Sequence, residues 1–259
     1  MTDISSPKSA PAKGQASVSE MARRHSSDTK TLVLFGGSFD PVHNGHLSAA
    51  LDARAQLKAA SVSLLPCHLP PHKATLQATG EQRLQMLRLA IAGTPELVVD
   101  PWELEQDSPS YTFATLTHYR QVYGPEACLI FLMGWDSLQT IMSWYRWQEL
   151  ERLANFAVWP RPGYSCLSGE VQAWVDQRQV AAGELQQYCA GKLAFLQTAP
   201  VAISSSAIRD GIAVGSAIEN AELDANTSRG DDNNARLKTL IPAAVWDYIK
   251  LNQLYLNTL

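Results

Sequence analysis

The chain has 259 residues, of which 46% are hydrophobic and 18% are charged, and its formal net charge is −4. This length and composition suffice for one sizeable core and exclude a chain that is disordered throughout. The negative charge excludes a global attraction to nucleic acid or to an anionic membrane, so any phosphate-binding surface must be local. No stretch approaches the ~18 apolar residues of a membrane span, and residues 1–30 lack the apolar centre of a secretory signal.

The four cysteines show no paired metal spacing and lie in apolar or helix-like stretches, which predicts reduced thiols that serve packing. They are Cys67, Cys128, Cys166 and Cys189. We therefore expect a cytoplasmic protein with no nucleic-acid partner and no membrane partner. The sequence leaves the oligomeric state open.

Residues 1–29 are rich in Ser, Ala, Pro and Lys and contain almost no large apolar side chain. Such a segment cannot offset its ordering entropy, so we expect a disordered N-terminal tail, with Met21 as an alternative start. An organellar transit peptide is the other interpretation, and Asp3, Glu20 and Asp28 count against it.

Short β-rich runs alternate with helical patterns from Thr31 onward. The expected strands are 31–35, 61–66, 97–100, 128–133, 155–159 and 193–197, and the expected helices are 46–59, 81–92, 112–122, 146–153 and 170–189. This alternation predicts an α/β fold, a Rossmann-like, doubly wound parallel sheet with helices on both faces. Ligands of such sheets bind beyond the carboxyl ends of the strands.

A polar segment rich in Asn and Asp occupies residues 216–236. Its composition favours an exposed, flexible insertion over a binding function. An apolar stretch at 237–256 follows it.

The first expected strand runs directly into residues 36–47, GGSFDPVHNGHL. Two glycines let the backbone approach a ligand closely, and a helix that begins near Gly45 would aim free N–H groups at an anion. His43 and His46 are one helical turn apart, so both imidazoles would face the same ligand and donate to phosphate oxygens.

Two rival interpretations apply to this segment. One histidine could simply cap or pack the helix, and Asp40, His43 and His46 could form a metal site, although no further ligand has matching spacing. The chain contains neither the GxxxxGK[ST] loop nor the GxGxxG fingerprint, which counts against a P-loop ATPase and an ordinary dehydrogenase. We therefore expect phosphate binding and no protein metal site.

A second phosphate-binding candidate, ISSSAIR at residues 203–209, follows the last expected strand and would begin a helix. Its serines would cap that helix, and Arg209 offers a guanidinium fork that matches phosphate geometry. By itself this is an ordinary helix start. Together with the first loop it predicts the other side of one site.

The paired motifs GGSFDPVHNGH and ISSSAIR resemble those of the nucleotidyltransferase superfamily with HxGH and (I/V)SSTxIR patterns. Within it, the chain resembles the bacterial nicotinate mononucleotide adenylyltransferases. The closer resemblance rests on PPHK at 70–73, PSYT at 109–112, GWDSL at 134–138, WY at 144–145 and RPGY at 161–164. It spans residues 31–215 and implies one nucleotidyltransferase domain at 30–259. Trp135 and Ser206 depart from the family pattern, which often has a smaller polar residue and Thr at these two positions.

The resemblance implies adenylyl transfer from ATP to nicotinate mononucleotide, with Mg²⁺ bound to ATP and His43, His46 and Arg209 as catalytic residues. The implied ATP-binding residues are Gly36, Gly37, Ser38, Phe39, His43, His46, Lys73, Gly134, Asp136, Ile203, Ser204, Ser205 and Arg209. Those implied for the mononucleotide are Ser38, Lys73, Tyr111, Thr112, Asp136, Trp144 and Tyr145. Packing within an aromatic cluster is the alternative for Trp144, Tyr145 and Trp147.

Other functions remain open at this point. The acceptor could be nicotinamide mononucleotide or phosphopantetheine, although the middle motifs count against the latter. A non-catalytic nucleotide sensor would be favoured by loss of His43, His46 or Arg209, and all three are present.

Overall fold

A computed structural model of the chain describes residues 31–69, 76–160, 166–197, 203–221 and 229–256. The expected tail at 1–29 and the motifs at 70–73 and 161–164 lie outside the described residues. In the described part, no helix combines the length and apolar character needed to cross a membrane.

The centre of the fold is a six-stranded sheet in which every strand pair is parallel. The strands are β1 (Thr31–Gly37), β2 (Val62–Pro66), β3 (Leu97–Val99), β4 (Cys128–Gly134), β5 (Asn155–Trp159) and β6 (Leu193–Phe195). Their order is β3-β2-β1-β4-β5-β6. The direction in which strands are added reverses between β1 and β4, which is where open α/β sheets form their binding crevice. The sheet confirms the predicted fold class, and the predicted strands agree with the observed ones to within two residues at each end.

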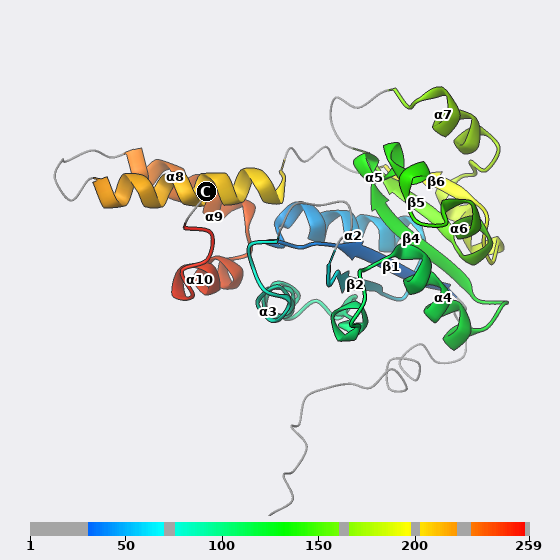
Figure 1. The fold of residues 1–259 in the computed structure, drawn as a ribbon, viewed down its shortest axis with the longest axis horizontal. Coiled ribbons are helices and arrows are strands. Elements are labelled where there is room, and N and C mark those ends of the chain that lie inside the picture. The colour runs from blue at the N-terminus through cyan, green and yellow to red at the C-terminus, as the bar shows by residue number, and fades with distance from the viewer. Residues whose placement is uncertain (1–30, 70–75, 161–165, 198–202, 222–228, 257–259) are drawn as a thin grey trace, which may run out of the picture.

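The helices that connect and cover the sheet are seen in Figure 1. They are α2 (Asn44–Gln56), α3 (Gly80–Ala90), α4 (Thr112–Tyr123), α5 (Trp135–Gln139), α6 (Trp147–Leu153), α7 (Gly169–Asp176), α8 (Ser205–Ala221), α9 (Arg229–Leu240) and α10 (Ala243–Leu251). Short 3₁₀ turns form η1 (Trp102–Glu105), η2 (Ile141–Ser143) and η3 (Ala182–Gln187).

Two apolar cores lie on the two faces of the sheet, because alternate residues of each strand point to opposite sides. On one face, Val33 and Phe35 of β1 pack with residues of α2, α3, α8 and α10. On the other face, Leu32 and Leu34 pack with residues of α4, α5, α6 and α7. Burial on both faces explains why the strands read as nearly continuous apolar runs.

The helix expected at 170–189 is wrong in extent. The structure has α7 up to Asp176 and the separate turn η3, with an extended segment between them. In that segment Gln179 bridges to Leu193, and the Val180 N–H donates to the Leu193 carbonyl at 2.8 Å. Pairing with β6 therefore interrupts the helical pattern.

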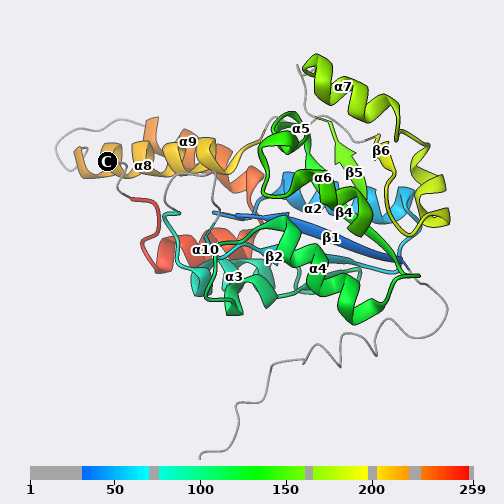
Figure 2. The same cartoon turned by 45° about the vertical axis from the view of Figure 1, so that its right-hand side comes forward.

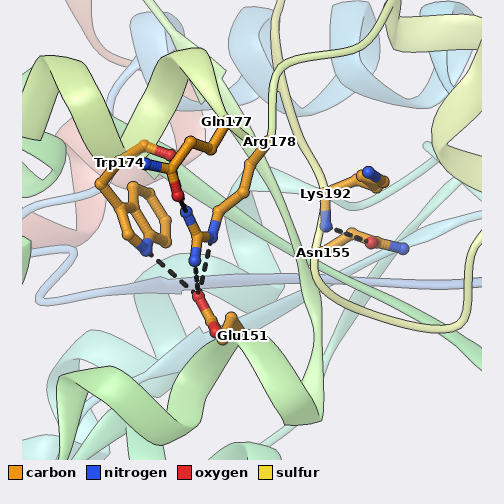
Figure 3. Close-up of polar contacts among 6 residues, drawn as sticks. All are labelled: Glu151, Asn155, Trp174, Gln177, Arg178 and Lys192. Atoms are coloured by element: carbon orange, nitrogen blue, oxygen red, sulfur yellow. Dashed lines mark hydrogen bonds and ion pairs between the residues drawn. The ribbon is translucent and has the colours of Figure 1, made fainter.

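A partly buried group of polar contacts links α6 to α7 and to Arg178, which lies just after α7 (Figure 3). The Glu151 carboxylate accepts from Arg178 Nε at 2.7 Å and from Trp174 Nε1 at 3.3 Å. The contact joins two elements on the same face of the sheet.

The polar segment at 216–236, expected to be a flexible insertion, is largely helical where it is described. Residues 216–221 continue α8, residues 229–236 belong to α9, and 222–228 lie outside the described residues. The two helices lie side by side and extend away from the sheet in Figures 1 and 2. A Cβ on Gly211 of α8 would be 3.0 Å from Leu237 Cδ2 of α9, so glycine permits this close approach. A polar composition is compatible with helices as well as with a loop.

The last helix, α10, returns to the first half of the sheet and packs against α3 (Figure 2). Trp246 and Ile249 of α10 share a core with Met86 and Leu87 of α3.

All four cysteines are free thiols, and Cys67 and Cys128 are buried.

Candidate active site

A cavity of about 650 Å³ opens where β1, β4 and β5 end. It is the crevice expected at the reversal of strand order. Fourteen of the sequence-predicted site residues line it: Gly36, Gly37, Ser38, His43, His46, Tyr111, Thr112, Gly134, Asp136, Trp144, Tyr145, Ser204, Ser205 and Arg209. Phe39 and Ile203 are not among the lining residues, and Lys73 lies outside the described residues.

The loop after β1 is shaped by close packing beneath it. A Cβ on Gly36 would lie 2.8 Å from Phe131 Cζ, and one on Gly37 would lie 2.9 Å from Phe39 Cζ. Only glycine fits at either position without displacing a ring. Phe39 is one of the residues expected to bind ATP, and its side chain is fully buried beneath the loop.

His43 and His46 stand together at the start of α2, as their spacing predicts. Their ring centroids are 3.7 Å apart with an interplanar angle of 22°. His43 is the residue that precedes the helix, and its backbone N–H donates to His46 Nδ1 at 3.3 Å. Because Nδ1 accepts this hydrogen bond, a neutral His46 carries its proton on Nε2.

Aromatic rings hold His46 in place. Its ring centroid lies 5.1 Å from that of Phe39, 6.0 Å from Phe35 and 6.5 Å from Trp159. This packing leaves the imidazole few alternative rotamers, which preorganises a hydrogen-bond donor for a ligand.

The start of α8 forms the opposite side of the cavity and touches the first loop. Ser204 caps α8 by accepting from the Ala207 N–H at 3.1 Å. Ser205 Oγ donates to the Pro41 carbonyl at 2.9 Å, and Arg209 donates to the Asp40 carbonyl at 2.6 Å. The two motifs predicted to form one site are thus joined directly.

The side chain of Asp40 is held by three hydrogen-bond donors of the protein. It is 1% exposed and accepts hydrogen bonds from the backbone N–H groups of Gln77 and Ala78 and from the Tyr255 hydroxyl, at 2.9, 3.1 and 2.8 Å. The described residues contain no group of three or more His, Cys, Asp or Glu that could hold a metal ion. The three donors on the Asp40 carboxylate count against the rival metal site at Asp40, His43 and His46.

Aromatic residues make up the far end of the cavity. The rings of Tyr111 and Tyr145 lie 4.8 Å apart, and Arg146 stacks 3.9 Å above the Phe113 ring beside them. Trp144 packs edge-on against Phe131 at 6.3 Å. Trp144 and Tyr145 each pack on a neighbouring ring and also line the cavity, so both the packing role and the ligand-facing position apply to them. Trp147 packs against the core and is not among the lining residues.

The lining also includes residues that sequence reasoning did not select. They are Phe35, Asp40, Leu76, Ser110, Ser137, Thr140, Ser143, Trp159 and Ser206. Trp159 could have been found as the last residue of a predicted strand next to the crevice. Its indole packs where a Cβ on Gly134 would lie 3.3 Å from Nε1.

Two buried charged residues support the cavity wall from behind. Arg83 of α3 is 1% exposed and donates to the Ser38 carbonyl at 2.8 Å. Glu103 accepts from Thr115 Oγ1 at 2.7 Å. Burial raises the pKa of Glu103, and hydrogen bonds from Thr115 and Ser110 lower this pKa in part. No local sequence signal marks either residue, because their partners lie 45 and 12 positions away, in other elements.

Known proteins resemble this chain in sequence and in fold. The sequence matches the model of the cytidylyltransferase-like family over residues 34–211. A protein of Laribacter hongkongensis named "Probable nicotinate-nucleotide adenylyltransferase" is 44% identical over 224 residues, which cover 86% of this chain and 93% of the relative. One of the same name from Saccharophagus degradans is 36% identical over 228 residues, covering 86% of this chain and 95% of the relative.

Among solved structures, the chain resembles Plasmodium falciparum nicotinic acid mononucleotide adenylyltransferase complexed with NaAD. The TM-score is 0.63 and the identity 19%, over 87% of this chain and 97% of that chain. At this identity the likeness shows the fold alone.

Proposed function

The chain belongs to the cytidylyltransferase-like family and, within it, to the nicotinate-nucleotide adenylyltransferases, and from this membership we propose that it transfers the adenylyl group of ATP to nicotinate mononucleotide. The products are nicotinate adenine dinucleotide and pyrophosphate. The observation that carries the proposal is the contact between the two phosphate-facing motifs, in which Arg209 donates to the Asp40 carbonyl at the edge of one cavity.

The reaction requires little acid–base chemistry. A phosphate oxygen of the mononucleotide attacks the α-phosphorus of ATP in line, the P–O bond to the β-phosphate breaks, and pyrophosphate leaves with the bonding electrons. Because the nucleophile is already an anion, no general base and no covalent intermediate are needed. The protein must align two anions and stabilise the charge that develops on the α-phosphate and the leaving group.

The residues at the β1 end of the cavity fit this task. We assign His46 Nε2–H to the α-phosphate in the transition state, since Nδ1 is engaged with the His43 N–H. His43 and the free N–H groups at the start of α2 would bind neighbouring phosphate oxygens. Arg209, Ser204 and Ser205 at the start of α8 would bind the pyrophosphate, together with Lys73.

Mg²⁺ would enter with ATP. The described residues offer no three-ligand cluster, and Asp40 is occupied by three donors, so the chain fits an ion that is held mainly by phosphate oxygens. When bound, such an ion would supply positive charge to the phosphates of ATP. The protein's own contribution is to orient the α-phosphate.

The aromatic end of the cavity would receive the mononucleotide. Tyr111, Tyr145 and Trp144 offer ring faces and edges for a pyridine, and Thr112 begins α4 with free N–H groups for a carboxylate. Asp136, exposed at the start of α5, would accept from a ribose hydroxyl.

We also infer that the reaction takes place in the cytoplasm, because free thiols are typical of a reducing compartment.

The proposal is tested by following pyrophosphate release from ATP and Mg²⁺ with nicotinate mononucleotide, nicotinamide mononucleotide and phosphopantetheine in separate assays. Release should be fastest with nicotinate mononucleotide. A preference for another acceptor would contradict the assigned substrate while keeping the reaction type. ATP binding without release from any acceptor would instead support a nucleotide sensor.

A further inference from the structure

Asp40 and Pro41 accept hydrogen bonds from helix α8 and from the C-terminal region, two parts of the chain that are distant in sequence. Arg209 donates to the Asp40 carbonyl at 2.6 Å, and Ser205 donates to the Pro41 carbonyl at 2.9 Å. The third partner is Tyr255, whose hydroxyl donates to Asp40 Oδ1 at 2.8 Å across 215 positions of sequence. The first two contacts come from the phosphate-facing helix α8, whereas Tyr255 lies outside the cavity lining.

Tyr255 is fixed in this position by its own surroundings. It is 6% exposed and follows the buried Leu254, whose N–H donates to the Ile249 carbonyl at 3.0 Å. Burial raises the pKa of Tyr255 strongly, and the nearby charge of Asp40 raises it further. The phenol therefore stays protonated and remains a hydrogen-bond donor.

The Asp40 carboxylate depends on that donor. The carboxylate is almost completely buried, and its other printed partners are the N–H groups of Gln77 and Ala78. A buried carboxylate is costly unless donors surround it, so loss of one donor favours a shift of the carboxylate toward water or toward new partners. Any such shift moves the backbone of the loop that carries Asp40.

We propose that Tyr255 is a positioning residue for the ATP side of the site. Its hydroxyl donates to the Asp40 carboxylate and fixes the position of Asp40. Asp40 in turn fixes the backbone carbonyls to which Arg209 and Ser205 donate. This inference rests on the proposed adenylyl transfer and extends it to a residue outside the cavity. Tyr255 touches no substrate in this arrangement. Its effect is on alignment, to which in-line phosphoryl transfer is sensitive.

The test compares Tyr255→Phe with Tyr248→Phe. Both changes remove one phenolic hydroxyl from the C-terminal region, and Tyr248 is a partly buried residue that packs on the same core. We expect Tyr255→Phe to lower kcat about ten-fold while the KM for nicotinate mononucleotide stays within about two-fold. Tyr248→Phe should leave both constants within about two-fold of the wild type.

Amide hydrogen exchange supplies a readout that does not depend on catalysis. In the protein without substrates, exchange of the Gln77 and Ala78 amides should accelerate about ten-fold in Tyr255→Phe and remain unchanged in Tyr248→Phe. If the wild type fails to release pyrophosphate with any mononucleotide, the proposed function is wrong, and this measurement still tests the Tyr255–Asp40 contact.

Three results would overturn the inference. One is an unchanged exchange rate at both amides in Tyr255→Phe. Another is accelerated exchange with an unchanged kcat, which would leave Tyr255 a purely structural residue. The third is an equal loss of kcat in both variants, which would indicate general destabilisation.

Discussion

The proton on His46 provides the sharpest test of the site. Replacement of His46 by Ala, Asn and Gln separates the two functions of the imidazole, since Nδ1 accepts from the His43 N–H at 3.3 Å while Nε2 is the atom that we assign to a phosphate oxygen. Ala removes both functions. Asn can supply only the acceptor near the helix start. Gln can accept through Oε1, as in an ordinary capping box, and still present an Nε2–H donor.

The expected magnitudes follow from these geometries. The 3.3 Å hydrogen bond is long, so its loss should lower the free energy of unfolding by about 1 kcal/mol or less. The loss of one preorganised donor in the transition state should lower kcat about 10²–10³-fold, or roughly 3–4 kcal/mol. His46→Ala and His46→Asn should both show this loss, whereas His46→Gln should lose only about ten-fold.

Steady-state pyrophosphate release with saturating ATP and nicotinate mononucleotide measures these effects. A suitable control is His118→Gln, because the His118 ring stacks on Trp102 at 4.2 Å and does not line the cavity. Its kcat should stay within about two-fold of the wild type. The reasoning is refuted if His46→Asn is as active as His46→Gln, since the essential donor would then not be Nε2.

Three further changes test the packing of the fold and of the cavity wall. Arg120 donates to five backbone carbonyls, so Arg120→Met should lower the free energy of unfolding by about 2–4 kcal/mol in urea titrations. The control is Arg88→Met at an exposed position, which should change this free energy by less than about 0.5 kcal/mol. Equal effects of the two substitutions would contradict the prediction. Burial raises the pKa of Glu103, so its stabilising contribution is present below the unfolded-state pKa of about 4.3 and is lost as pH rises through the folded-state value. The free energy of unfolding of the wild type should therefore fall relative to that of Glu103→Gln as pH rises above about 4.3. A difference between the two free energies that stays constant from about pH 4 to about pH 8 would count against a buried, protonated Glu103. Gly36→Ala would place a Cβ 2.8 Å from the Phe131 ring, so thermal unfolding should report a loss of about 1–3 kcal/mol together with reduced activity, and a variant of unchanged stability would show that the ring yields.

The strands could be predicted from the sequence because a strand buried on both faces leaves a local apolar run. β5 was predicted with both ends correct, and β1 continues only into the two glycines of the loop. The short helix α5 was not predicted, since a five-residue element shows too little periodicity to detect. The long helix expected at 170–189 was wrong because hydrogen bonds of Arg178 and Val180 with Leu193 of β6, which lies outside the predicted helix, decide the backbone there.

The candidate site shows the same division. His43, His46 and the start of α8 were predicted to meet because each motif follows a strand of a parallel sheet, and the cavity brings them together. The residues behind the wall were missed, because the contact of Arg83 with Ser38 joins positions 45 apart and is not expressed in any spacing. The side chain of Phe39 belongs to the core although the residue lies inside the motif, and its contact with ATP stays a prediction.

The span of the contacts at Asp40 bears on the order of events in folding. Arg209 and Tyr255 reach this residue across 169 and 215 positions, and β1 must pair with β4, almost a hundred residues later in the chain. Contacts between such distant positions carry a large loop-closure entropy and form slowly compared with helices. In a refolding experiment, enzymatic activity should therefore recover later than the helical circular dichroism signal. The delay between the two recoveries would measure how long β1 takes to pair with its neighbouring strands.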